Sequence, residues 1–349
     1  MVVLSIPIQT LYAEIIDLLM AIDARRSIGH APGAFVTKTL ASGTYYYFQY
    51  SEPGGGARQV YIGRKSAALD GLVRRYAGER ELAKADAASV EATCAALRAG
   101  GASTTDARSA RVLGALADAA VFKLGGVLVG TQAFIAIANL LGVRWEGGVA
   151  RTEDVDIAAE RVLEVAVPDL RSDVPAVLEG LEMGFLPVPG FSPDAPSTSF
   201  KVRGQALRLD LVTPAKSAGR STKPVPIRRL NAAAAPVRFL DYLLEDVQPA
   251  AIINGGGVLV TVPHPARFAV HKLLVAQDRP VAMQAKSRKD VAQAARVIEA
   301  LEELRPGDVR AAATVARARG KAWKTALERG TTLLRGVDEK AVKALGVRR

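Results

Sequence analysis

The chain has 349 residues, enough for two or three domains with a substantial core. Its 49% hydrophobic and 23% charged residues are typical of a globular protein and exclude a disordered one. A single cysteine, Cys94, excludes an internal disulfide and is expected to be a small buried residue on a helix. With this one cysteine and only three histidines, a zinc site is not expected.

Two apolar stretches raise the question of a membrane. Residues 1–20 lack a basic start and are interrupted by Glu14 and Asp17, which predicts an amphipathic helix and not a signal peptide. Residues 121–143 contain Lys123 and three early glycines, so a strand, a turn and a helix account for them better than a membrane span. The sequence therefore predicts a cytoplasmic protein with no membrane partner.

The positive charge is concentrated at one end of the chain. The formal net charge is +11, and residues 286–349 carry 16 Lys and Arg against 8 Asp and Glu, a net of +8. Residues 151–182 have an excess of acids instead. A basic tail beside an acidic centre suits an enzyme that handles a polyanion. The alternative is a solvated basic helix surface that only aids solubility.

The first part of the chain reads as a small α+β domain, residues 1–105. A helix is expected at 8–23, three short strands at 35–40, 44–50 and 58–63, a long helix at 66–100, and a helix capped by residues 103–106 that runs to 122. The tyrosine-rich strands, with Lys38, Arg58, Arg64 and Lys65, resemble the small sheet that some tyrosine recombinases place on DNA. Aromatic strands packed on a helix would give the same pattern, so both interpretations stay open.

The rest of the chain predicts an α/β (α+β) fold with a mixed sheet over residues 106–263 and a helical basic domain over 264–349. The elements expected are strands at 124–130, at the Asp154–Asp156 segment, and at 199–202, 206–212, 251–254 and 258–262, with helices at 132–141, 174–183 and 239–245. A flexible loop is expected at 214–226. The C-terminal helices are expected to break at Pro280, Pro306 and Gly330.

Three carboxylates lie in apolar alternating segments. Asp154 and Asp156 are two residues apart and follow Gly130-Thr131 by 23 residues, and Asp210 lies in a second such run. Residues i and i+2 of a strand point the same way, about 6.5–7 Å apart. These acids therefore predict a site for Mg²⁺ and a nucleoside triphosphate, with the start of the following helix holding phosphate. The alternative is a pair of solvated acids with Asp210 as a chance strand residue.

Three segments together resemble the core of the nucleotidyltransferase superfamily, the fold of DNA polymerase beta: Leu124–Phe134, Arg151–Ile157 and Leu207–Pro214. Pro263–Leu274 and Lys286–Asp290 extend the likeness to the helical part of bacterial minimal nucleotidyltransferases, including the toxin type of some toxin–antitoxin pairs. The resemblance covers about residues 121–300. Gly130-Thr131 stands where Gly-Ser is usual, and the longer gap to Asp154 indicates an inserted turn around 142–148.

The resemblance implies roles for individual residues. Asp154, Asp156 and Asp210 would hold Mg²⁺ (or Mn²⁺), and Gly130 and Thr131 would cradle the phosphates of the NTP. Lys272 matches a lysine that contacts the triphosphate in the toxin-type relatives, and Asp290 matches an aspartate that assists it. For these two, a solvated helix lysine and a charge at a helix N-terminus are the alternatives.

Further residues near these motifs were assigned by position. Arg151 and Thr152 flank the acids and would contact a phosphate or fix the loop, and His271 is expected to pack or cap. The basic residues of the 214–226 loop would fold over the substrate or keep the loop soluble. Trp145 and Trp323 are expected to be packing residues.

The resemblance implies transfer of a nucleoside monophosphate from an NTP to an acceptor hydroxyl, with release of pyrophosphate. The acceptor would be RNA, with tRNA favoured by the basic tail, or a protein side chain or a small molecule. A cognate antitoxin is a further possible partner. The alternative is a non-catalytic module that binds nucleotide or nucleic acid in a two-gene system.

Overall fold

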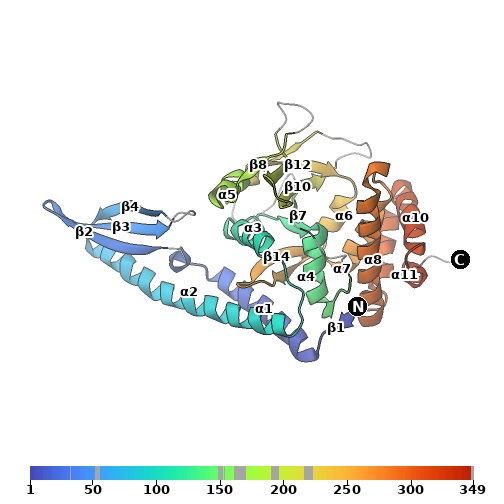
Figure 1. Ribbon diagram of the computed structural model, residues 1–349, viewed down its shortest axis with the longest axis horizontal. Coiled ribbons are helices and arrows are strands. Elements are labelled where there is room, and N and C mark those ends of the chain that lie inside the picture. Colours follow the sequence, from blue (N-terminus) through green and yellow to red (C-terminus); the bar gives the residue numbers. More distant parts are fainter. Residues whose placement is uncertain are drawn as a thin grey trace.

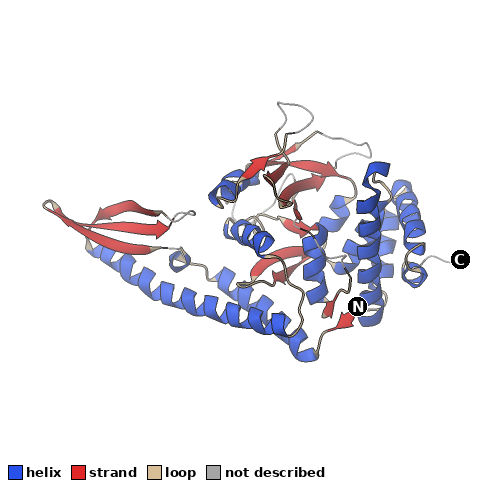
Figure 2. Cartoon of the chain, in the orientation of Figure 1, coloured by secondary structure: helices blue, strands red, loops and turns tan. Residues whose placement is uncertain are grey.

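The computed structural model describes residues 1–31, 33–51, 56–147, 152, 154–160, 170–189, 196–215 and 223–346. It is elongated: a helical arm tipped by a three-stranded sheet projects from a mixed α/β body, and a group of helices covers the body at the other end (Figure 1). Figure 2 shows that the strands lie in the tip and the body while helices form the arm and the C-terminal end.

The tip of the arm is an antiparallel sheet in the order β2 (Ala34–Leu40), β3 (Gly43–Ser51), β4 (Ala57–Arg64). It lies on α2 (Ala67–Ala99), whose first turn is capped by the Ser66 hydroxyl accepting from the Leu69 N–H. The ring of Tyr76 on α2 packs edge-on against the rings of Phe35 and Phe48, at 5.1 and 5.6 Å. The three strands and the long helix confirm the expected elements.

The other half of α2 packs on the body. Cys94 and Leu97 of α2 are fully buried against Ile15 of α1 (Ile6–Ala24). The Tyr12 hydroxyl of α1 donates to the Ala251 carbonyl of β13 at 2.9 Å. β13 (Val247–Ile252) and β14 (Val258–Pro263) form a two-stranded antiparallel sheet. The burial of Cys94 on a helix confirms its expected packing role.

A seven-stranded mixed sheet forms the centre of the body. Its main order is β11–β12–β10–β7–β5; β9 also pairs with β10, and β8 pairs with β9. β10 is parallel to β7 and β12, and the other pairs are antiparallel. The strands are β5 (Val127–Val129), β7 (Asp154–Ala158), β8 (Phe185–Pro187), β9 (Ser199–Val202), β10 (Arg208–Pro214), β11 (Val225–Ile227) and β12 (Ala232–Val237).

Helices and short strands surround this sheet. α3 (Ala107–Asp118), α4 (Gly130–Leu140), α5 (Val174–Gly180) and α6 (Leu240–Leu244) belong to the body, and β1 (Val2–Val3) pairs with β6 (Val143–Arg144). α7 (Pro265–Ala276), α8 (Gln284–Leu304), α9 (Asp308–Ala318), α10 (Lys321–Arg335) and α11 (Glu339–Ala344) follow. Short 3₁₀ turns lie at Ile28–His30, Arg228–Leu230 and Val281–Met283.

One expected helix break is wrong. Gly330 lies inside α10, and the break falls at Gly320, which has a φ of +115°. A Cβ atom at Gly330 would lie 2.4 Å from the Leu273 carbonyl oxygen of α7. This glycine therefore allows two helices to pack in direct backbone contact and does not end one.

The expected loop at 214–226 is also partly wrong. β10 extends to Pro214, and residues 225–227 form β11, while residues 216–222 lie outside the described part. The two tryptophans pack as expected: Trp145 stacks on Phe134 at 4.9 Å, and Trp323 meets Phe239 edge-on at 4.6 Å. No helix in the described part of the chain is both long and apolar enough to cross a membrane.

Candidate active site

The three aspartates lie on one face of two neighbouring strands. β7 and β10 run parallel, and their register places Asp156 opposite Asp210 and Asp154 opposite Arg208. The intervening residues of both strands point the other way and are fully or almost fully buried in the body: Val155, Ile157, Leu209 and Leu211. The alternation of these two short runs therefore fixes where the acids point. The structure brings together the three carboxylates that the sequence singled out.

Gly130 joins the acids to the start of α4. Its φ of +67° lies in the left-handed region, and a Cβ atom there would lie 2.0 Å from Asp156 Oδ2. Only glycine fits both demands. The N-cap residue of α4, Val129, offers no side-chain cap. The first N–H groups of α4 thus lie beside the acids without a capping side chain, which suits an anionic group.

The side chain of Thr131 connects the start of α4 to another helix. It is buried, and its hydroxyl accepts from the Gln293 amide of α8 at 3.2 Å. This hydrogen bond ties the start of α4 to the C-terminal helices. Thr131 still lines the cavity beside the acids, so its backbone remains a candidate phosphate contact.

Asp154, Asp156 and Asp210 together are called the acidic wall, and their electrostatics favour a bound cation. Burial, followed by the charges of Asp210 and Asp154, raises the pKa of Asp156 to about 6, although the charge of Lys272 works to lower it. Asp210 is partly compensated: its Oδ1 accepts from Arg208 Nε at 2.7 Å and from the Ser199 hydroxyl. Asp156 is thus the carboxylate that gains most from a cation nearby.

These carboxylates fit a divalent cation by their donor chemistry. Mg²⁺ prefers oxygen ligands and is held by one or two carboxylates together with substrate phosphates, so it needs no cage made by the protein alone. Among the described residues, no group of three or more histidine, cysteine, aspartate or glutamate side chains is close enough to form one. Asp154 and Asp156 suit the two-carboxylate arrangement, whereas Asp210 is engaged by Arg208 and Ser199.

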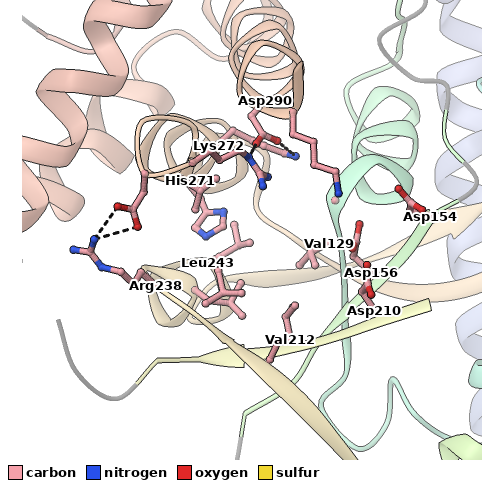
Figure 3. Close-up of a pocket in the computed structure, with 18 of the residues that line it drawn as sticks. Val129, Asp154, Asp156, Asp210, Val212, Arg238, Leu243, His271, Lys272 and Asp290 are labelled. Carbon is pink, nitrogen blue, oxygen red and sulfur yellow. Dashed lines mark hydrogen bonds and ion pairs between the residues drawn. The ribbon is translucent and has the colours of Figure 1, made fainter. Parts of the chain in front are cut away.

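The acids line a cavity of about 650 Å³ between the central sheet and the C-terminal helices. This volume is within the usual range for small-molecule sites. Figure 3 shows Asp154, Asp156 and Asp210 on one side and His271, Lys272 and Asp290 across from them. Apolar residues also line the cavity, among them Val212, Val237, Leu240, Leu243, Phe268 and Val275. The lining thus combines the acids of β7 and β10, cations of α7 and α8, and an apolar set.

Lys272 is not the exposed helix lysine that one interpretation expected. Its side chain is 10% exposed, and its Nζ donates to Asp290 Oδ1 at 2.7 Å. Arg279 Nε donates to the other carboxylate oxygen of Asp290 at 2.6 Å. Burial works to raise the pKa of Asp290, but the two cations outweigh it and the pKa is lowered. Asp290 also lies well inside α8, so it is not a charge at the helix N-terminus.

His271 lines the same cavity. It is 7% exposed, and its Nε2 has no hydrogen-bond partner within the described residues. Burial, followed by the charge of Lys272, lowers its pKa to about 3. The imidazole is therefore neutral at physiological pH and offers an uncharged polar group to a ligand. The sequence predicted only packing or capping here, and the burial confirms the packing.

Several cationic residues of the site were missed. Lys286 and Lys289 line the cavity from the first turns of α8, three residues apart and therefore on one side of the helix. Burial, followed by the charge of Lys272, lowers the pKa of Lys289. Arg208 stands two residues before Asp210 on the same strand face, a signal readable from the sequence. Arg279 could not be found in that way, because it reaches Asp290 only through the fold.

The residues flanking the acids divide into two cases. The Thr152 hydroxyl accepts from the backbone N–H of Asp154 at 3.0 Å, so it fixes the start of β7, one of the two roles expected for it. Arg151 lies outside the described residues.

Comparison with known proteins agrees with this geometry. A family model described as "Nucleotidyltransferase" matches residues 107–317, well over half of the chain. Among solved structures, the chain is similar to the crystal structure of an antigenic nucleotidyltransferase-like protein from Paracoccidioides brasiliensis. That match has 14% identity and a TM-score of 0.31, and covers 64% of this chain and 94% of the other, so no argument is built on it. Curated proteins give no match. From the family model and its extent, the chain belongs to the nucleotidyltransferase family.

Proposed function

We propose that this nucleotidyltransferase moves a nucleoside monophosphate from an NTP to an acceptor hydroxyl in a reaction that depends on Mg²⁺ or Mn²⁺. The observation that carries the proposal is the acidic wall: Asp154 and Asp156 on β7 beside Asp210 on β10, pressed against the start of α4. A set of repelling carboxylates next to unpaired helix amides has little use without a cation and an anionic ligand.

Different residues of the chain would bind the cation and the phosphates. Asp154 and Asp156 would hold the divalent cation, which when bound neutralises the triphosphate and draws charge from the reacting phosphorus. The amides at the start of α4 would bind phosphate oxygens, and Lys286 and Lys289 would face the charge that builds on the leaving pyrophosphate.

In the transfer step the acceptor oxygen forms a bond to the α-phosphorus as the bond to the β-phosphate bridge oxygen breaks. Pyrophosphate leaves with the electron pair of that broken bond. Asp210 would accept the proton of the acceptor hydroxyl, and Arg208, at 2.7 Å, would hold its carboxylate in place. The apolar part of the cavity, around Leu243 and Phe268, would hold the base.

We propose RNA, with tRNA favoured, as the acceptor, because residues 286–349 carry a net charge of +8. Part of this charge is structural: Arg317 donates to the Leu345 carbonyl at 2.7 Å, and Arg319 pairs with Asp241 at 2.8 Å and with Glu245. A contact with RNA in this region would instead use exposed residues of α10, namely Lys321, Lys324 and Arg329.

The engagement of Asp210 favours a second candidate, a module that binds nucleotide without turnover. In that case Arg208 would keep Asp210 from the reaction permanently. The two candidates differ in whether pyrophosphate is released.

The experiment is incubation of the protein with each of the four α-labelled NTPs, Mg²⁺ or Mn²⁺, and total RNA. We expect label in RNA and stoichiometric pyrophosphate, both lost in Asp154→Asn and Asp156→Asn. Asp118→Asn, which removes a carboxylate that is 69% exposed and pairs with Arg26 at the surface, is the matched control and should transfer as the native protein does. NTP binding with no pyrophosphate from any NTP, metal or acceptor would establish the binding module instead.

A further inference from the structure

The tip of the arm presents one face of its sheet to solvent. The strand register places Lys38 opposite Tyr45, and Tyr45 opposite Arg64, on this face. Tyr47 lies opposite Tyr61 on the same face. The other face carries Phe35 and Phe48 and packs on α2, as described above. The face with Tyr45, Tyr47 and Tyr61, together with Lys38 and Arg64, is called the tyrosine face here.

The three tyrosines form one aromatic platform. The Tyr61 ring lies 6.1 Å from the Tyr45 ring and 5.6 Å from the Tyr47 ring, measured between centroids. Tyr61 is 56% exposed, which is high for an aromatic residue. Lys38 Nζ lies 4.7 Å from the centre of the Tyr47 ring. Tyr45 and Tyr47 are partly exposed, and rings that hold one another in place offer flat stacking surfaces at little entropic cost.

The charge of this sheet has a single sign. The described residues of β2, β3 and β4 include no aspartate or glutamate, while Lys38, Arg58 and Arg64 are basic and Lys65 follows. A positive surface with interleaved aromatic rings is complementary to a nucleic-acid strand, which has a negative backbone and bases that stack. It is not complementary to an acidic or an apolar protein surface to the same degree, since it offers both features side by side.

The distance between the sheet and the body indicates how long a ligand that contacts both has to be. α2 has 33 residues and is therefore about 50 Å long, with the sheet at its first turns and the body at its last turns. The sheet is thus held away from the body that contains the cavity (Figure 1). A ligand that occupies both regions at once has to be a polymer.

We infer that the tyrosine face is a binding surface for single-stranded nucleic acid, whose bases stack on Tyr45, Tyr47 and Tyr61 while Lys38 and Arg64 contact phosphates. Unpaired bases are required, because the bases of a duplex do not expose their faces to an aromatic side chain. The identification of this strand as the acceptor rests on the proposed function, whereas the binding itself does not.

The test measures binding without nucleotide or metal, so a failure of catalysis cannot imitate it. The probes are a fluorescein-labelled 20-nucleotide single-stranded RNA, single-stranded DNA of the same sequence, and the corresponding RNA duplex. Anisotropy titrations compare the native protein with Tyr47→Leu, Tyr61→Leu and the double variant. Tyr50→Leu is the matched control, because Tyr50 lies on the same strand as Tyr47 but on the other face.

We expect each tyrosine substitution to weaken binding of single strands by about 5- to 140-fold, the range that loss of one base–aromatic stack produces. Tyr50→Leu should bind as the native protein does. Comparison of RNA with DNA then shows which strand is preferred. The inference is overturned if single strands bind no more tightly than the duplex, if the tyrosine variants bind as well as the native protein, or if Tyr50→Leu loses as much affinity as they do. Melting curves of all variants distinguish a lost surface from a lost fold.

Discussion

Replacement of Asp156 by asparagine tests whether this carboxylate destabilises the fold when no cation is bound. Burial and the charges of Asp210 and Asp154 raise its pKa from 3.8 to about 6 in the folded protein. A folded-state pKa above the unfolded value means that the folded protein binds the proton more tightly. The contribution of this group to stability is therefore favourable at low pH, is lost as the pH rises through about 4 to 6, and stays lost at neutral pH.

The size of the effect follows from the shift. A difference of about 2.2 pKa units corresponds to about 3 kcal/mol at 1.36 kcal/mol per unit, and access of water from the cavity reduces this to about 1–3 kcal/mol. With an unfolding entropy of about 2.1 cal/mol/K per residue, 349 residues give about 1.4 °C per kcal/mol. Asp156→Asn should therefore melt about 1–4 °C higher than the native protein at pH 7.5 in EDTA. At pH 4 the two proteins should melt at about the same temperature.

The assay is a set of melting curves between pH 4 and pH 8, with EDTA and with 10 mM Mg²⁺. Mg²⁺ should raise the melting temperature of the native protein at pH 7.5 and should have a smaller effect on the asparagine variant, which has lost one anionic ligand. Asp118→Asn controls for removal of a negative charge. A variant that melts below the native protein at pH 7.5 in EDTA, or that keeps the native pH profile, would refute the view that Asp156 is a repelled carboxylate awaiting a cation.

Other perturbations have equally definite outcomes. Lys272→Ala should lower the free energy of unfolding by about 2–4 kcal/mol in urea titrations, because Asp290 then keeps only one of two cations in a buried site; an unchanged midpoint would show that the pair does not stabilise the fold. Gly130→Ala should abolish transfer and destabilise the protein, since the new Cβ atom meets the Asp156 carboxylate; activity near the native level would disprove this contact. Lys286→Gln and Lys289→Gln should each raise the KM for NTP by about tenfold, which corresponds to the loss of about 1.4 kcal/mol for a charged contact. The melting temperature should change little. An unchanged KM would show that these lysines do not contact the NTP.

The acidic wall was predictable from sequence because strand alternation is a local rule. Asp154, Val155 and Asp156 need no tertiary information to point in alternate directions, and the same holds for Arg208 and Asp210. The pairing of β7 with β10, which brings the two sets together, could be expected only through the resemblance to a known core. The metal role of these residues stays a prediction.

The strands that were missed lack intrinsic strand preference. Residues 232–237 of β12 read Ala-Ala-Ala-Ala-Pro-Val, a composition that favours other structures, and β8 and β11 have three residues each. They become strands because β10, β9 and one another offer backbone groups to pair with. The helix break expected at Gly330 is wrong because the role of this glycine comes from tertiary packing. Its effect depends on α7 lying against α10, which no pattern within α10 reveals.

The pairing of Lys272 with Asp290 shows the same limit at the site itself. The two residues are 18 positions apart, on two helices, and only the packing of α7 on α8 brings them to 2.7 Å. Sequence alone left Lys272 as either a phosphate ligand or a solvated lysine. The structure shows a buried ion pair at the edge of the cavity, so Lys272 cannot meet a phosphate without sharing its charge with Asp290.

Under the proposed function, this arrangement couples the binding of Mg²⁺ to the binding of NTP. A triphosphate that enters the cavity meets cations of α7 and α8 on one wall but the carboxylates of β7 and β10 on the other. The carboxylates repel it unless a divalent cation is present, and a cation alone finds carboxylates but no phosphate to complete its ligands. Each ligand therefore supplies the charge that the other lacks. Because coupling between two ligands is reciprocal, the proposed function predicts that Mg²⁺ tightens NTP binding by the same factor by which NTP tightens Mg²⁺ binding. The hydrogen bond between Gln293 and Thr131, which ties α8 to the start of α4, helps to hold the two walls at the spacing on which this coupling depends.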